Sequence, residues 1–231
     1  MLLTDYKYIT SPPLDQPAAD GRFLTIRRLG LQDYEPIWRA MRYIAEHPEK
    51  QRGDEIWLLS HKPVFTLGQA GRREHVLNPG QIPVVHSDRG GQVTYHGPGQ
   101  LVAYLLLDVK RRRLGVKDLV ALIENSVIES LADYRITAQG KPKAPGVYVD
   151  DAKIAALGLR IRRGRSYHGL SLNVSMDLAP FELINPCGYE GLKVTRVADL
   201  VEDQENLMRR ISIDLTNKLL GKLNHQPITE Q

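Results

Sequence analysis

The run from Leu101 to Leu107 is apolar at every position, and it constrains the fold more than any other stretch of the 231-residue chain. A strand that is apolar on both faces has to be covered on both faces, so this run predicts a central strand with other elements packed above and below it. A Gly97-Pro98-Gly99 turn leads into the run, and the residues before the turn, Val93 to Tyr95, favour a further strand. The chain therefore needs a layered fold with a sheet at its centre.

Other segments of strand character surround this run, and amphipathic helices lie toward both ends of the chain. Strands are expected at about 22–29, 56–60, 64–68, 82–86, 147–149, 153–161 and 167–174, and helices at about 34–45, 116–134 and 207–220. Pro83 places the strand at 82–86 on a sheet edge. Helices and strands do not alternate strictly, so the sequence predicts an α/β (α+β) fold with a mainly antiparallel mixed sheet flanked by helices.

No internal repeat or linker divides the chain, which predicts a single catalytic domain over residues 21–222. Residues 1–20 carry a Ser-Pro-Pro segment and a further proline, and we expect them to form a poorly ordered N-terminal arm. Residues 223–231 are expected to be a C-terminal tail.

Composition and charge narrow the class of protein. The hydrophobic fraction of 42% and charged fraction of 25% are those of an ordinary soluble globular protein, with no apolar stretch long enough to cross a membrane. A single cysteine and no visible secretory signal favour the cytoplasm. The net charge of +4 is compatible with an acidic partner. Aromatic residues make up only 6%, with no basic and aromatic stripe, so we expect no nucleic-acid partner.

The lone cysteine, Cys187, has no disulfide partner within the chain, so it is either a small buried hydrophobe or a reactive group. Pro186 fixes a backbone torsion before it, and Gly188 allows a sharp turn after it. A shaped loop of this kind suits a reactive thiol, although the pattern alone leaves both interpretations open.

Several other kinds of site are not supported by the sequence. The Gly90-Gly91 pair is not followed by Gly-Lys-Ser/Thr and does not open a helix, which disfavours a phosphate loop. The glycines could form a tight bend or let an elongated apolar ligand lie against the backbone. His86, His96 and His168 form no zinc pattern. The chain has no Gly-x-Ser-x-Gly elbow, and the only histidine after Cys187 is His225 in the tail, unlike a papain-type protease.

A lysine ammonium near Cys187 would stabilise its thiolate, and the neutral amine could accept and return protons. Lys153 begins a predicted strand that could run beside the segment leading to Cys187. The three arginines Arg111 to Arg113 are either a solvated helix face or a docking point for an acidic partner.

Four blocks of this sequence together resemble the lipoyl(octanoyl) transferase family. They are Arg89-Gly-Gly-Gln-Val-Thr-Tyr-His-Gly-Pro-Gly-Gln100, Lys153-Ile-Ala-Ala-Leu-Gly-Leu-Arg-Ile161, His168-Gly-Leu-Ser-Leu-Asn-Val174 and Asn185-Pro-Cys-Gly188. They occur in register over residues 22–220. The resemblance implies the fold of lipoate and biotin protein ligases, and octanoyl transfer from octanoyl-acyl carrier protein to a lysine of lipoyl domains, as in 2-oxoacid dehydrogenase complexes.

The resemblance also implies roles for individual residues. Cys187 would be the acyl-thioester nucleophile and Lys153 its charge partner, with His168 in a possible supporting role. The acyl chain would lie against Arg89, Gly90, Gly91, Gln92, Val93, Thr94, Tyr95, His96, Ala156, Leu157, Gly158, Gly169, Leu170 and Ser171. Backbone N–H groups around the cysteine loop would stabilise the oxyanion.

No cofactor, metal or ATP is expected for this reaction, because a thioester is already activated and the amide product lies downhill. Arg160, Arg162, Arg163 and Arg165, with Arg111–Arg113, could steer an acidic carrier. Two alternatives remain at this point: an ATP-dependent lipoate or biotin protein ligase, and a non-catalytic acyl-binding module. The pairing of Cys187 with Lys153 is what distinguishes the transferase, since adenylation needs no cysteine nucleophile.

Overall fold

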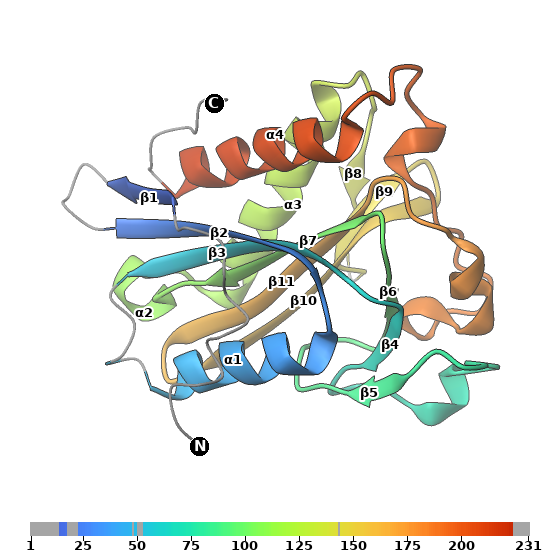
Figure 1. Cartoon of the computed structure of the whole chain (residues 1–231), viewed down its shortest axis with the longest axis horizontal. Helices are drawn as coiled ribbons and strands as arrows, with labels where there is room; N and C mark the ends of the chain where they lie inside the picture. Colours follow the sequence, from blue (N-terminus) through green and yellow to red (C-terminus); the bar gives the residue numbers. More distant parts are fainter. Residues whose placement is uncertain (1–13, 18–22, 48, 50–52, 143, 224–231) are drawn as a thin grey trace.

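A computed structural model describes residues 14–17, 23–47, 49, 53–142 and 144–223. An eight-stranded sheet runs through the middle of the molecule in the order β1-β2-β3-β7-β11-β10-β9-β8 (Figure 1). Its strands are β1 (Leu14–Pro17), β2 (Phe23–Gln32), β3 (Asp54–His61), β7 (Gln100–Leu106), β8 (Gln139–Gly140), β9 (Gly146–Val149), β10 (Ala152–Arg162) and β11 (Arg165–Asn173). Only β2 and β3 are parallel in this sheet, which confirms the prediction of a mainly antiparallel mixed sheet.

Strand β7 lies between β3 and β11, and all seven of its residues are buried. The prediction of a central covered strand is therefore confirmed. Its neighbours are fixed in register, with Tyr104 opposite Trp57 of β3 and Gly169 of β11. A side chain added at Gly169 would collide with the carbonyl oxygen of Ala103, so this position of β11 has room only for glycine.

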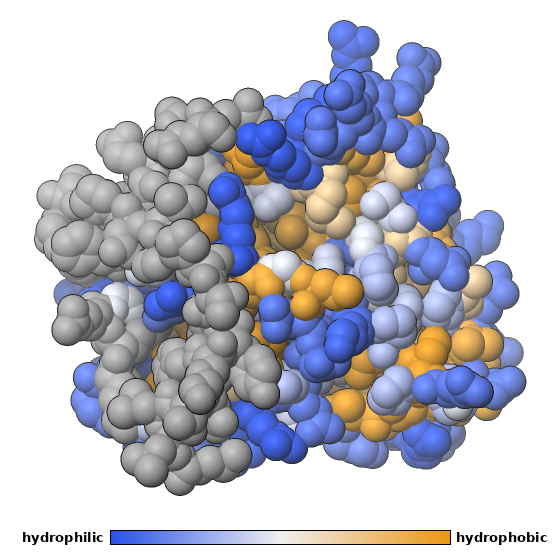
Figure 2. All heavy atoms as spheres, in the orientation of Figure 1, coloured by the Kyte–Doolittle hydropathy of each residue, from blue (hydrophilic) through white to orange (hydrophobic). Residues whose placement is uncertain are grey.

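Helices cover both faces of the large sheet (Figure 1). Helices α3 (Val116–Ala132) and α4 (Leu207–Lys222) pack on each other and on one face, where Ile123, Leu215 and Leu105 belong to the same buried apolar cluster. Helix α1 (Tyr34–Glu46) covers the other face through Ile37 and Met41. These helices turn their charged side chains outward, and Figure 2 shows a hydrophilic surface over α4. No helix in the described ranges is both long and apolar enough to cross a membrane.

A second sheet of three strands lies beside the first, in the order β5-β4-β6. Its strands are β4 (Val64–Leu67), β5 (Val84–His86) and β6 (Val93–His96), so the strand that follows Pro83 does lie at an edge. Although only Lys62 and Pro63 separate β3 from β4, the two strands belong to different sheets. Short helical turns complete the chain: α2 (Val109–Arg112), η3 (Arg73–His75), η4 (Ala179–Leu183), η5 (Pro186–Gly188) and η6 (Val197–Asp199).

Part of the predicted N-terminal arm is a strand. Within the predicted N-terminal arm, residues 14–17 form strand β1, which pairs antiparallel with β2. The other arm residues, 1–13 and 18–20, and the tail residues 224–231 lie outside the described residues.

Arg111 and Arg113 are exposed, as expected of a solvated face, but two of the three arginines also bind a buried acid. Arg111 and Arg112 both donate to the fully buried carboxylate of Asp54, at 2.9 Å and 2.5 Å. They are thus charge partners of a buried acid, which no spacing in the sequence indicated.

Candidate active site

Cys187 and Lys153 meet at the start of β10. The Lys153 Nζ lies 3.0 Å from the Cys187 Sγ, although the residues are 34 positions apart in the chain. Lys153 is only 4% exposed, whereas Cys187 is partly exposed. The sequence-predicted pair is thus brought together, with the thiol reachable from solvent and the amine covered.

The cysteine sits on the one-turn segment η5, at a position that an L-residue seldom adopts. Cys187 has φ 58° and ψ 13°, in the left-handed region, and Gly188 follows with φ 78°. A side chain at Gly188 would approach Gln92 and His75 at 3.3–3.4 Å, which the glycine avoids. The next two amides are already used, because Gly188 N donates to Asn185 O and Tyr189 N donates to Pro186 O. The expectation that amides of this loop bind an oxyanion therefore does not hold for these two.

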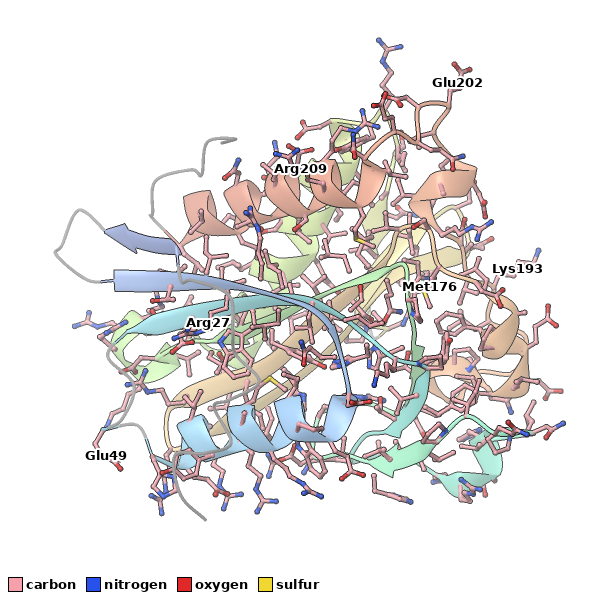
Figure 3. All side chains as sticks on the ribbon, viewed as in Figure 1. Arg27, Glu49, Met176, Lys193, Glu202 and Arg209 are labelled. Carbon is pink, nitrogen blue, oxygen red and sulfur yellow. The ribbon has the colours of Figure 1, made fainter. Side chains whose placement is uncertain are left out.

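Backbone hydrogen bonds hold Lys153 in place at the start of β10. Its N–H donates to Lys193 O at 2.8 Å, its carbonyl accepts from Thr195 N at 3.0 Å, and a bulge interrupts the pairing with β9 just after it. The side chain of Lys193 itself points outward into solvent (Figure 3). These bonds tie the segment that follows the cysteine loop directly to the strand that carries the lysine.

The Lys153 ammonium has three stabilising neighbours. It donates to Pro145 O at 3.2 Å, approaches the Cys187 sulfur, and lies 5.1 Å from the ring centroid of Tyr148. Burial opposes the positive charge of Lys153. The charge of Cys187 and the hydrogen bond to its sulfur, with a smaller contribution from Tyr148, nevertheless raise the pKa of Lys153 above its usual value. The geometry therefore holds a charged amine within hydrogen-bond distance of the thiol.

An apolar pocket extends from Cys187 between β10, β11 and the segment leading to β6. Its predicted lining residues are Arg89, Gly91, Gln92, Val93, Thr94, His96, Ala156, Leu157, Gly158, Gly169, Leu170 and Ser171, and His168, which was expected only in a supporting role, lines it as well. Tyr34 of α1 and Tyr104 of β7 also line it and were not predicted. Their signals were hidden, because Tyr34 has the spacing of a packing residue of its helix and Tyr104 is one member of an apolar run.

Two predicted residues do not line the pocket. The Tyr95 side chain points into the core of the three-stranded sheet, where its ring packs against Phe65 and Phe181. Gly90 instead joins the pocket wall to β10, since its N–H donates to Leu159 O at 3.1 Å.

Arg89 holds one wall of the pocket through hydrogen bonds, and it is also a buried charge. Its guanidinium donates to Thr66 Oγ1, Thr66 O, Gly90 O and Gln92 O, at 2.6–3.0 Å, and so fixes the turn that forms one wall. The side chain is 7% exposed, and none of the ion pairs among the described residues involves it. Burial lowers the pKa of Arg89, while the Tyr34 and Cys187 groups raise it. Arg89 therefore adds positive potential to the side of the pocket where a thiolate would form.

The end of the pocket away from Lys153 is polar. His96 Nδ1 bonds to Gln100 Oε1 at 2.7 Å, and His168 Nε2 bonds to Asp88 Oδ1 at 3.0 Å. Burial lowers the pKa of both histidines, so they are neutral near neutral pH. Burial opposes ionisation of Asp88, but hydrogen bonds from His168, Tyr167 and Trp38 outweigh it and hold the pKa of Asp88 below its usual range.

The chemistry available here is nucleophilic attack by a thiolate held beside a cation, on a group whose apolar tail fits the pocket.

Comparisons with known proteins identify the family of this chain. Residues 33–219 match the family model of the lipoyl protein ligase A/B catalytic domain. The octanoyltransferase of Hahella chejuensis is 61% identical over 180 residues, which are 78% of this chain and 80% of that protein. The octanoyltransferase of Pseudomonas entomophila is 65% identical over 177 residues, 77% of this chain and 82% of that one.

Solved structures show the same fold at low identity. Lipoate-protein ligase A bound with ATP superposes with a TM-score of 0.67 at 14% identity, covering 90% of this chain and 87% of that one. A bi-partite lipoate protein ligase from Thermoplasma acidophilum gives a TM-score of 0.64 at 15% identity, covering 84% and 82%. The predicted fold is confirmed, and the chain belongs to the lipoyl protein ligase A/B catalytic domain family, and within it to the octanoyltransferases.

Proposed function

We propose that this chain transfers an octanoyl group from octanoyl-acyl carrier protein to a lysine of lipoyl domains, through an acyl thioester on Cys187. The observation that carries the proposal is the 3.0 Å contact of Lys153 Nζ with Cys187 Sγ at the end of an apolar pocket. Acceptors would include lipoyl domains of 2-oxoacid dehydrogenase complexes, and the reaction would be the first step of endogenous protein lipoylation.

In the first half-reaction the Cys187 thiolate attacks the thioester carbonyl of the donor. The new bond joins the Cys187 sulfur to the acyl carbon, and the bond to the carrier sulfur breaks. The departing carrier thiolate takes the proton of the Lys153 ammonium. The products are octanoyl-Cys187, neutral Lys153 and the carrier thiol.

Acylation removes the negative charge that stabilises the Lys153 ammonium. Burial then dominates, because it is the largest influence on this group and lowers the lysine pKa. Neutral Lys153 is therefore ready to accept the proton of the attacking amine in the second half-reaction. The amide forms, the thiolate leaves, and the ammonium–thiolate pair is restored without ATP.

Two other functions share parts of this site. A lipoate or biotin ligase would adenylate a free acid, and the fold is shared with a ligase solved with ATP. An acyl-binding module would use the pocket without chemistry. Neither alternative requires a partly exposed thiol within hydrogen-bond distance of a buried lysine, which is why the transferase is preferred.

Intact-mass analysis after incubation with octanoyl-acyl carrier protein, without ATP, tests the mechanism. We expect one octanoyl group per chain on Cys187, lost when a lipoyl domain is added and recovered on that domain. Cys187→Ser should form no adduct, and its rate of transfer should fall by at least about 1000-fold. Transfer that requires ATP would favour the ligase, and full transfer by Cys187→Ser would overturn the covalent mechanism.

A further inference from the structure

We propose that Tyr34, together with Tyr104 and His168, forms an end stop of the acyl pocket and that the Tyr34 ring sets the longest acyl chain accepted. The inference rests on the proposed function, since it concerns the substrate range of the same site. These three residues line the pocket and come from three separate elements, α1, β7 and β11.

The register of the sheet places the stop at the end of the pocket away from the dyad. Lys153 lies at the start of β10, and the pocket wall continues along that strand through Ala156 to Gly158. Gly158 faces Gly169 of β11, which in turn faces Tyr104 of β7, while His168 is opposite the next residue of β10. The tyrosine and histidine rings therefore lie at the end of the pocket away from Lys153.

Hydrogen bonds hold the two tyrosines of the stop in place. Tyr34 OH bonds to Ser87 Oγ at 2.7 Å, and Tyr104 OH bonds to His61 Nε2 at 2.7 Å. His61 is in turn fixed by a 3.1 Å bond from Nδ1 to Gln32 O. A chain longer than the pocket would have to move one of these buried, paired hydroxyls and leave its partner unpaired, which is costly. An octanoyl chain that ends against the rings incurs no such cost.

Tyr34 is the member of the stop that can be changed most simply. Tyr104 and His168 are held within strands, and His168 has a φ of 61° besides. Tyr34 instead begins helix α1, and its ring lies against the rings of His61 and His96, with centroids 5.1 and 5.9 Å apart. The helix is anchored independently through Ile37 and Met41. Shortening the Tyr34 side chain therefore opens space directly continuous with the pocket.

The test compares donors carrying C6, C8, C10 and C12 acyl groups, with kcat/KM for transfer to a lipoyl domain as the measured quantity. In Tyr34→Leu we expect the C10-to-C8 ratio to rise by about tenfold or more, since one or two methylenes in an apolar pocket discriminate on this scale. Tyr34→Phe keeps the ring but removes the bond to Ser87, so its ratio should rise less than that of Tyr34→Leu. Tyr43→Ala removes an equally large ring from the same helix outside the pocket and should not change the ratio.

The outcomes separate this inference from the proposed function. If the wild type transfers octanoyl groups but Tyr34→Leu, folded by circular dichroism, keeps the wild-type ratio, the end stop is wrong. It is equally wrong if Tyr43→Ala changes the ratio as much as Tyr34→Leu does. If Tyr34→Leu does not fold, Ala156→Leu, which narrows the same pocket nearer the dyad, must shift the preference toward C6 for the proposal to stand. If the wild type transfers no acyl group of any length, the proposed function itself fails.

Discussion

Lys153 contacts Tyr148 as well as Cys187. Tyr148 is 2% exposed, and its hydroxyl donates to Ala144 O at 3.1 Å, which holds the ring beside the ammonium. A second cation, Lys141, lies over the same ring at 4.7 Å from its centroid. Glycine is required at 146 for the same assembly, because φ is 141° and a side chain would lie 3.0 Å from Lys153 Cε. The ring and the turn together determine where the ammonium rests.

Replacing Tyr148 should therefore weaken the dyad without removing it. A cation–π contact contributes roughly 1 kcal/mol, so Tyr148→Leu should slow alkylation of Cys187 by iodoacetamide at pH 7 about fivefold. Tyr148→Phe retains the ring and should react nearly as fast as the wild type, while Lys153→Ala sets the lower limit. Equal rates for the Phe and Leu variants would show that the ring face does not act on Lys153, whatever their stabilities.

At this scale the sequence was informative about the nucleophile and less so about its surroundings. The isolation of Cys187 between Pro186 and Gly188 left a buried and a reactive thiol both open, and the resemblance paired it with Lys153. Their contact could not follow from periodicity, because it depends on how β10 and the loop pack across 34 positions of chain. Tyr34 and Tyr104 were missed for the same reason, since burial in a core and burial at a pocket end produce the same sequence pattern.

The element α2 shows how a charged segment can be part of the interior. Asp54 begins β3 with no exposed surface, and its Oδ1 accepts from Asp108 N at 2.8 Å. Arg111 and Arg112 bind its other oxygen, so the carboxylate joins the sheet to the turn after β7. Sequence patterns do not reveal this arrangement, because an acid and two arginines more than 50 positions apart carry no spacing signal.

Neutralising the Asp54 carboxylate should lower the stability of the fold. Asp54→Asn keeps the shape and the acceptor for Asp108 N but removes the counter-charge of Arg111, Arg112 and Arg165. We expect a loss of about 3 kcal/mol in the free energy of unfolding, measured by urea denaturation. Arg113→Ala, which changes the third arginine of the run, should stay within about 0.5 kcal/mol of the wild type. If the two variants are equally stable, the buried charge cluster is not what holds α2.

The order of strands belongs to a larger scale and was the least predictable part of the fold. The strand positions and the central place of β7 follow from apolar patterning, but adjacent strands in the chain need not pair. β3 and β4 diverge into two sheets, while β7 pairs with β11, which is far along the sequence. Such choices depend on which pairings bury the most apolar surface together, so they are set by the whole molecule.

The whole molecule also carries a histidine cluster whose protonation is linked to folding. Burial lowers the pKa of His61 to about 4, and lowers those of His96 and His168 as well. In the unfolded chain each would titrate near 6.5, so between about 6.5 and the folded value the unfolded state binds more protons. Stability from these groups is therefore complete above 6.5 and is lost as the pH falls toward 4, with His61 contributing roughly 3 kcal/mol over that range.

Urea denaturation at pH 7 and pH 5 tests this linkage. The wild type should be clearly less stable at pH 5, and His61→Gln should lose about 2 kcal/mol less than the wild type between the two values, because its proton-binding difference is gone. His86→Gln is the matched control, since His86 is exposed on β5, and it should lose as much as the wild type. Equal losses in the wild type and His61→Gln would mean that the acid sensitivity arises from other groups. It would also mean that the buried surroundings of His61 tolerate a positive charge.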